Sequence, residues 1–231
     1  MKVIGMIGGM SWESSLEYYR LINEKVKERL GGLHSARCLM YSVDFAEIEV
    51  LQHQGRWEEA TELMVDAAGR IERGGADFLI ICTNTMHLMA PEISRNISIP
   101  LLHIADAAAE RIKKLGLKKV GLLGTRFTMQ QKFYRDRLKD GHGIDVVVPD
   151  EEGMTLVHDV IYKELCLGVI RDSSRDVYKK IIKKMAGEGA QGVVLGCTEI
   201  PLLISQGDCD IPLFDTTAIH TEAAVDFALA G

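Results

Sequence analysis

The sequence has few cysteines, and their arrangement argues against two common roles. Its 231 residues include only five of them, Cys38, Cys82, Cys166, Cys197 and Cys209. The number is odd and no two form a Cys-x-x-Cys pair, which argues against a disulfide framework and against a zinc ribbon. The seven histidines contain no His-x-x-x-His pair, so we expect no metal site.

The sequence also lacks a basic cluster and a long hydrophobic run. Its formal net charge is −6, and no concentration of lysine or arginine offsets it, so we expect no nucleic-acid partner. The first apolar run meets Gly8 and Gly9 too early for a signal peptide or a membrane span. We therefore expect a cytoplasmic protein with no membrane partner. A composition of 47% hydrophobic and 26% charged residues is typical of a globular chain, with one large domain or two small ones.

Apolar runs that alternate with amphipathic segments predict an α/β fold with a parallel sheet. We expect strands at residues 3–9, 36–43, 76–81 and 99–104, and helices at 14–30, 58–74, 86–96 and 105–115, with a short helix inside 44–54. Ser14 and Glu17 can form a capping box at the start of the first helix. The glycines after the first strand do not match the Gly-x-Gly-x-x-Gly fingerprint, which gives NAD binding little support.

The order of these segments repeats once along the chain. Residues 119–125 resemble 2–8, residues 192–198 resemble 78–83, and residues 211–216 resemble 99–104. Such a repeat predicts two copies of one α/β unit. We expect a first domain of residues 1–98 plus 213–231 and a second domain of residues 99–212. Their strand ends are expected on either side of a cleft, which is a common place for a ligand.

Two expected strand ends carry similar polar groups. The run Phe78–Ile81 continues into Cys82, Thr83, Asn84 and Thr85, and its repeat ends in Cys197, Thr198 and Glu199. Open α/β sheets bind ligands at the carboxyl ends of their strands. Thr83 or Cys82 on one wall and Cys197 on the other could invert a carbon acid, one group removing the proton and the other delivering one. A thiol suits this work because its reference pKa is about 8.5. Thr85, Thr125, Thr198 and nearby backbone amides can hold a carboxylate.

The segments Cys82-Thr-Asn-Thr-Met-His87 and Leu195-Gly-Cys-Thr-Glu199 resemble the paired signature of the aspartate/glutamate racemase superfamily. Residues 8–14, 102–106, 124–129 and 214–216, with His220, extend the resemblance over essentially the whole chain. It is closest to the broad-specificity and L-aspartate/glutamate-type amino-acid racemases. The resemblance implies two pseudo-symmetric, doubly wound (Rossmann-like) domains with the active site in the interdomain cleft, and a homodimer. It further implies a racemase that inverts aspartate or glutamate with two bases and no cofactor. Pyridoxal phosphate is not expected, because no lysine stands at a strand end facing the cleft.

The first wall can be aligned with the family in two ways. The family usually reads Cys-Asn-Thr-x-His, and alignment on Asn84, Thr85 and His87 places Thr83 in the catalytic position. Adjacent strand residues point to opposite faces, so Cys82 would then pack behind Thr83. Alignment of the two Cys-Thr dipeptides instead makes Cys82 the base, which a local bulge would allow. We favour Thr83 with Cys197. A threonine hydroxyl is a poor base, and the family's second cysteine serves the L-enantiomer, so the resemblance implies a preference for L-substrates.

The expected substrate contacts depend mainly on the resemblance. It implies contacts from Met10, Gln52 and Asn84. Members of the family often use an arginine and a lysine here; this chain offers Arg56 near Gln52, and Cys166 stands where the lysine is expected, with Lys163 one turn earlier.

Several assignments stay open at this stage. Glu199 orients Cys197, binds the substrate ammonium, or only stabilises a helix N-terminus. His103 and His220 either tune a thiolate or are structural. The alternatives for the whole chain are a hydantoin racemase, maleate isomerase or arylmalonate decarboxylase type of enzyme, and a non-catalytic amino-acid-binding protein.

Overall fold

The computed structural model describes residues 1–230, which pack as two compact units. Unit 1 comprises Met1–Ile104 together with the C-terminal segment from His220, and unit 2 comprises Ala105–Ile219. Each unit contains one sheet in which all strand pairs are parallel. The predicted α/β class with two parallel sheets is therefore confirmed.

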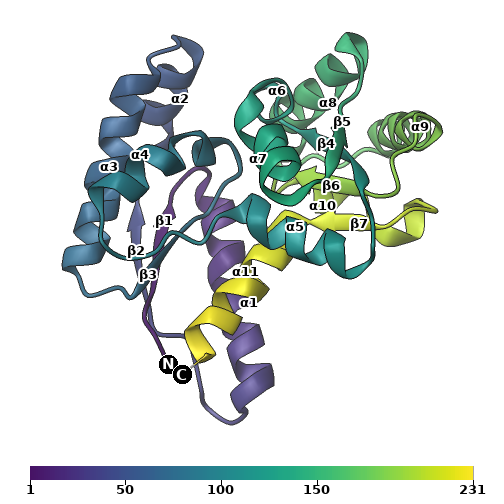
Figure 1. Cartoon of the computed structure of the whole chain (residues 1–231). Helices are drawn as coiled ribbons and strands as arrows, with labels where there is room; N and C mark the ends of the chain where they lie inside the picture. Colours follow the sequence, from purple (N-terminus) through teal and green to yellow (C-terminus); the bar gives the residue numbers. More distant parts are fainter. Residues whose placement is uncertain (231) are drawn as a thin grey trace. The chain divides into compact units, whose positions relative to one another are not determined.

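Unit 1 is built on a three-stranded sheet with the order β2-β1-β3 (Figure 1). Its strands are β1 (Ile4–Gly8), β2 (Cys38–Ser42) and β3 (Phe78–Ile81). Its helices are α1 (Trp12–Leu30), α2 (Phe45–His53), α3 (Trp57–Arg73), the 3-10 turn η1 (Thr85–Met89), α4 (Ala90–Asn96) and most of α11 (Thr216–Leu229). Leu101 adds an isolated bridge to Leu79 at the edge beyond β3.

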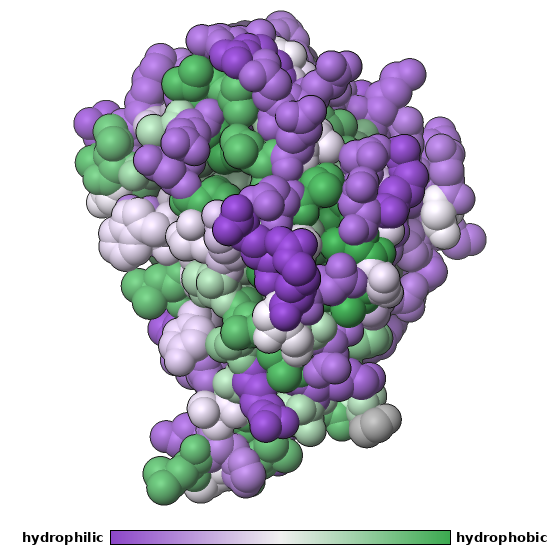
Figure 2. All heavy atoms as spheres, turned by 90° about the vertical axis from the view of Figure 1, so that its left-hand side faces the viewer, coloured by the Kyte–Doolittle hydropathy of each residue, from purple (hydrophilic) through white to green (hydrophobic). Residues whose placement is uncertain are grey.

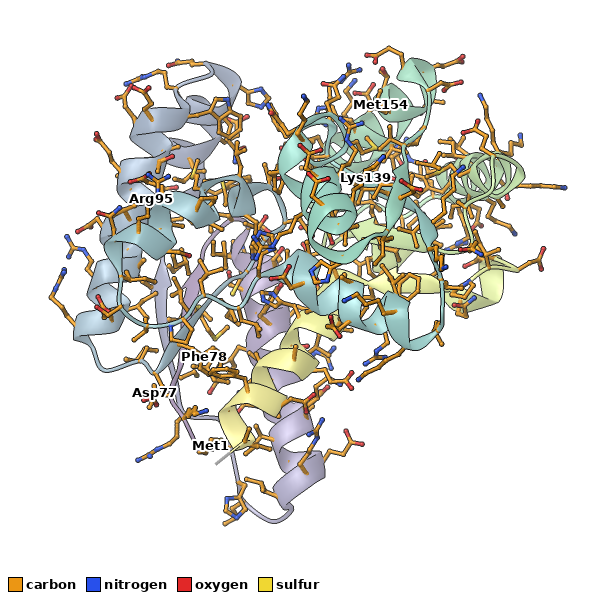
Figure 3. All side chains as sticks on the ribbon, in the orientation of Figure 1. Met1, Asp77, Phe78, Arg95, Lys139 and Met154 are labelled. Carbon is orange, nitrogen blue, oxygen red and sulfur yellow. The ribbon has the colours of Figure 1, made fainter. Side chains whose placement is uncertain are left out.

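The central strands of unit 1 are buried on both faces, because alternate side chains enter different cores. Ile80 of β3 packs with residues of α1 and α11, whereas Leu79 and Ile81 pack with residues of α3. Phe78, labelled in Figure 3, belongs to the α11 side, where its ring centroid lies 4.7 Å from that of Phe227. Burying each such side chain contributes about 1.5–3 kcal/mol, so the position of β3 is strongly determined.

Unit 2 is built on a four-stranded sheet with the order β5-β4-β6-β7. Its strands are β4 (Lys119–Gly124), β5 (Asp145–Val147), β6 (Val193–Gly196) and β7 (Leu213–Asp215). Its helical segments are α5 (Ile104–Lys114), α6 (Arg126–Gln130), α7 (Lys132–His142), α8 (Glu151–Lys163), η2 (Leu165–Leu167), α9 (Asp172–Gly187), α10 (Ile200–Leu203) and η3 (Gln206–Asp208). If Leu101 is counted as the fourth position of the first sheet, both sheets have the same strand order, as the sequence repeat predicts.

Three expected features differ in the structure. The first helix begins at Trp12, not at residue 14, and Ser11 is its N-cap, accepting from the Ser14 amide at 3.4 Å. The capping box of Ser14 and Glu17 is therefore wrong, because Ser14 already lies inside the helix. The strand expected at 99–104 is wrong except for the bridge at Leu101. The helix expected at 86–96 begins as the 3-10 turn η1 and becomes α-helical only at Ala90.

None of the helices within residues 1–230 combines the length and the apolar character that crossing a membrane requires.

Candidate functional site

Most of the predicted site residues follow β1, β3, β4 or β6, and Gln52 lies on α2. β1 pairs with β2 on one side and with β3 on the other, and β4 stands in the same way between β5 and β6. The carboxyl ends of β1 and β3, and of β4 and β6, are therefore the points where the strand order reverses. Ligands of open α/β sheets bind at such switch points. We call Met10, Gln52, Thr83, Asn84 and Thr85 the first half-site, and Thr125, Cys197, Thr198 and Glu199 the second half-site.

In the first half-site, the side chains of Met10 and Gln52 are both buried. Met10 follows the glycine turn after β1 and is buried in the same core cluster as Met86 of η1. Gln52 is buried on α2, and its Nε2 donates to the Met86 sulfur at 3.0 Å. Both residues are thus part of the packed interior of unit 1.

The thiol of Cys82 and the hydroxyl of Thr83 have different surroundings. Cys82 is completely buried in the core formed with α1 and α11, on the same face of β3 as Ile80. Burial and the neighbouring Cys38 raise the pKa of the Cys82 thiol well above its usual range. Thr83 is partly exposed, and Asn84 and Thr85 after it are buried. The main-chain carbonyl of Thr83 lies 2.8 Å from Nδ1 of His87.

The second half-site contains a hydrogen-bonded group of three consecutive residues directly after β6. The Cys197 thiol donates to Oε2 of Glu199 at 2.9 Å, and the Thr198 hydroxyl donates to the same oxygen at 2.7 Å. Burial and the negative charge of Glu199 raise the pKa of the Cys197 thiol well above its usual value. Behind this group, the Thr216 hydroxyl donates to the carbonyl of Leu195 at 2.8 Å.

Thr125 follows β4 in the same unit. It is the N-cap of α6, and its Oγ1 accepts from the Thr128 amide at 3.3 Å. Thr125 is buried and lies 3.2 Å from the Thr128 hydroxyl. This arrangement holds a hydroxyl at the switch point between β4 and β6.

The two cations that the sequence offers for a substrate carboxylate are already engaged at the surface. Arg56 donates from Nε to Glu59 at 2.6 Å, and Lys163 donates to Asp159 at 2.9 Å. Cys166 is exposed on η2, which begins two residues after the end of α8. The structure therefore gives no support to a direct carboxylate contact from Arg56 or Lys163.

Two residues near the first half-site form hydrogen bonds that the sequence does not predict. The Ser15 hydroxyl on α1 accepts from the Gly9 amide at 2.7 Å and so fixes the turn after β1. His87 bonds to the Thr83 carbonyl. The sequence did contain a signal for His87, since it lies four residues after Thr83 in the polar stretch, but spacing alone does not show where a ring nitrogen points.

Among residues 1–230, no three His, Cys, Asp or Glu side chains gather as a set that could hold a metal ion. A surface hollow of about 610 Å³ lies in unit 1, and it is lined from α3, η1 and α4. The residues that line it include Glu58, Glu62, Glu92 and Arg95. Arg95 is labelled in Figure 3. None of the lining residues belongs to the first half-site. We do not connect this hollow with the chemistry at the strand ends.

Residues 7–224 match the family model for Asp/Glu/hydantoin racemases, and the chain belongs to that family. The match includes both half-sites and all seven strands except the start of β1.

Individual relatives are similar over nearly the whole chain. The broad-specificity amino-acid racemase RacX of Bacillus subtilis (strain 168) is 23% identical over 235 residues, which cover 99% of each chain. A crystal structure of a candidate Asp/Glu racemase from Yersinia pestis is 54% identical, with a TM-score of 0.95 over 99% of this chain and 100% of that one. The structure of an aspartate racemase homologue from Pyrococcus horikoshii OT3 is 37% identical, with a TM-score of 0.87 over 99% of each chain.

Proposed function

We propose that this racemase-family protein inverts the α-carbon of an acidic amino acid, aspartate or glutamate, without a cofactor. Thr83 and Cys197 would act as the two proton-transferring groups on opposite faces of the substrate. The observation that carries the proposal is the place of these residues in the fold: Thr83 is the second residue after β3 and Cys197 the first after β6, and both strands end at the switch point of their sheet. The names of the relatives, which include amino-acid and aspartate racemases, support the same reaction class.

In the proposed reaction, Cys197 as a thiolate removes the α-proton of the L-enantiomer. The hydroxyl of Thr83 then donates a proton to the opposite face, and solvent restores both groups to their starting protonation states. A threonine hydroxyl is a poor base, so the reverse abstraction from the D-enantiomer would be slow and L-substrates would be preferred. Met10, Gln52, Asn84, Thr85, Thr125, Thr198 and Glu199 are proposed to contact the substrate.

The surroundings of Cys82 support Thr83 as the first-wall group. A proton-transferring group must be able to reach the substrate. Cys82 is completely buried behind β3 against α1 and α11. Thr83 is the more exposed of the two.

The test is proton NMR of L- and D-aspartate and glutamate in deuterium oxide, without added cofactor. Wild type is expected to exchange the α-proton of an L-substrate and to form the D-enantiomer.

Cys197→Ser should abolish this exchange, a loss of at least about 100-fold for removal of a catalytic base. Thr83→Ala should impair inversion but leave exchange with retention. Cys82→Ala is the matched control and should behave as wild type. Full racemisation by Thr83→Ala would contradict the assignment, and loss in Cys82→Ala would favour the other alignment.

A further inference from the structure

A buried group of three histidines and a tyrosine lies close to Thr83 in unit 1. We call His87, His103, His220 and Tyr18 the histidine cluster. The ring centroids of His87 and His103 are 4.5 Å apart, and those of His87 and His220 are 5.7 Å apart. All four side chains are buried, with at most 4% of their surface exposed. Its members come from η1 (His87), the residue before α5 (His103), α11 (His220) and α1 (Tyr18), and η1 also carries Thr85 of the first half-site.

The two hydrogen bonds of His87 define which of its nitrogens carries a proton. Nδ1 lies 2.8 Å from the Thr83 carbonyl, which can only accept, so Nδ1 carries the hydrogen. Nε2 lies 3.2 Å from the Ile104 amide, which can only donate, so Nε2 carries the lone pair. These two bonds together require the neutral ring with its proton on Nδ1.

His220 has the opposite arrangement. Its Nε2 lies 2.9 Å from the carbonyl of Leu102, so Nε2 is the donor. Its Nδ1 lies 2.9 Å from the Tyr18 hydroxyl. The two rings therefore donate to main-chain carbonyls from different nitrogens, His87 from Nδ1 and His220 from Nε2.

The histidines also explain why the strand expected at 99–104 stops. Leu79 donates to the Pro100 carbonyl at 2.8 Å and accepts from the Leu102 amide at 2.9 Å, as in a parallel ladder. The next two groups of such a ladder would be the Leu102 carbonyl and the Ile104 amide. His220 and His87 bind these groups instead, and α5 begins at Ile104.

These hydrogen bonds link the turn that contains Thr83 to the two points where the chain crosses from one unit to the other. The chain leaves unit 1 after Ile104 and re-enters it at His220. His87 links the Thr83 carbonyl to the first of these places. His220 belongs to the second, and it binds the carbonyl of Leu102 close to the first.

We propose that His87 is a positioning residue for Thr83: its Nδ1–H fixes the Thr83 carbonyl and so directs the hydroxyl at the end of β3. The inference rests on the proposed function, in which Thr83 delivers the proton that completes inversion. His87 is not a catalytic residue in this proposal, because it acts on the main chain of Thr83 and touches no substrate. Its effect is therefore confined to the proton delivery proposed for Thr83.

The test compares two variants that each keep one of the two bonds of His87. An asparagine can replace Nδ1 as the donor to Thr83, and a glutamine can replace Nε2 as the acceptor for Ile104. Exchange of L-aspartate in deuterium oxide is measured by NMR, and inversion is separated from exchange with retention by chiral analysis.

We expect His87→Gln to lower the rate of inversion about tenfold, as for one lost buried hydrogen bond, while the rate of exchange with retention stays near that of wild type. His87→Asn should keep most of the inversion. His34→Gln, at an exposed position of unit 1, should match wild type.

Several outcomes would overturn the proposal. If His87→Gln loses inversion and exchange with retention to the same extent, the role of His87 is generally structural. If both variants invert and exchange at wild-type rates, His87 has no role. Nitrogen-15 NMR of the wild-type ring tests the geometry even if a variant fails to fold, and a proton on Nε2 of His87 would contradict it. If wild type exchanges no amino acid, the proposed function itself fails, which is a different result from an active wild type with unaffected variants.

Discussion

At the scale of single residues, the proposed role of Cys197 depends on its hydrogen bond to Glu199. The thiol donates to the Glu199 carboxylate, and both burial and that charge raise the pKa of Cys197. A raised thiol pKa means that the thiolate, the form that abstracts a proton, is scarce at neutral pH and increases as the pH rises. Exchange of the L-substrate α-proton should therefore increase with pH into the alkaline range.

Replacing Glu199 by glutamine should move this dependence to lower pH. The substitution removes the negative charge that opposes ionisation of Cys197 but leaves a side chain of similar size. We expect the midpoint of the rise in exchange rate to shift down by about one pH unit, which corresponds to roughly 1.4 kcal/mol of lost repulsion. The pH profile of deuterium exchange measures it, and Glu188→Gln, at an exposed position of the same unit, is the control. A midpoint that stays or moves upward would contradict the role of Glu199.

The residues of the site differ in how far the sequence could predict them. Cys197 and Thr83 follow apolar runs and belong to recognisable motifs, so they could be proposed from the sequence. The bonds of Glu199 to two neighbours and of His87 to the Thr83 carbonyl could not, because they depend on side-chain rotamers. Arg56 likewise donates to Glu59 although other acidic residues are near it in the sequence, and the sequence does not show which of them it binds.

At the scale of elements, the turn between β1 and α1 supports the first half-site. Gly9 has a φ of +94°, and its amide donates to Ser15 on α1. A side chain at Gly9 would place its Cβ 2.2 Å from the carbonyl oxygen of Val43, which is main chain and cannot swing away. The Val43 amide in turn donates to the Gly8 carbonyl at 3.0 Å. The turn therefore joins the ends of β1 and β2 to α1, and Met10 follows directly.

Gly9→Ala should destabilise the protein strongly. Backbone strain and the clash with Val43 together are expected to lower the free energy of unfolding by about 3–5 kcal/mol. Gly143→Ala is the matched control, since Gly143 has a φ of +69° but nothing within 4 Å of an added Cβ. It should cost only about 1–2 kcal/mol, the cost of the left-handed backbone alone. Urea unfolding followed by circular dichroism measures both, and equal losses would show that the contact with Val43 is unimportant.

The elements show where sequence reasoning succeeds and where it stops. Buried strands such as β3 were predictable because four consecutive apolar residues suit a strand covered on both sides. The start of α1 was placed two residues late because Ser11 and Ser14 are both able to cap a helix, and only the backbone path selects Ser11. The missing fourth strand of unit 1 has a non-local cause, since His87 and His220 take the groups that would extend the ladder.

At the scale of the whole molecule, the repeat gives each unit one half of the proposed chemistry. Both sheets share one strand order when the bridge at Leu101 is counted, and small polar side chains follow β3 and β6. The halves are not equivalent: the first presents a hydroxyl in a turn held by His87, and the second a thiol bonded to a carboxylate. The proposed preference for L-substrates depends on this inequality. The domain boundaries expected from the sequence, and a cleft between the domains, remain predictions.

The homodimer that the family resemblance implies also remains a prediction, and the surface of α1 indicates where a second copy would bind. On the side shown in Figure 2, apolar side chains are scattered among hydrophilic ones. Trp12, Leu16 and Tyr19 differ, because their spacing places them along one face of α1. They are exposed by 64%, 57% and 48%, whereas Tyr18 beside them is buried. We call these three residues the α1 stripe.

A two-fold axis would set the α1 stripe against its own copy, since a two-fold interface uses the same patch twice. Aromatic side chains are enriched in such interfaces, and the stripe would supply the apolar centre of the roughly 800 Å² that each partner must bury. Leu16→Glu places a charge in the middle of this face and should convert the dimer to monomers, as measured by sedimentation velocity over a range of protein concentrations. Leu115→Glu, which changes a leucine of similar exposure in unit 2, should leave the dimer intact. A monomeric wild type would contradict the homodimer, and a dimer that tolerates Leu16→Glu would place its interface elsewhere.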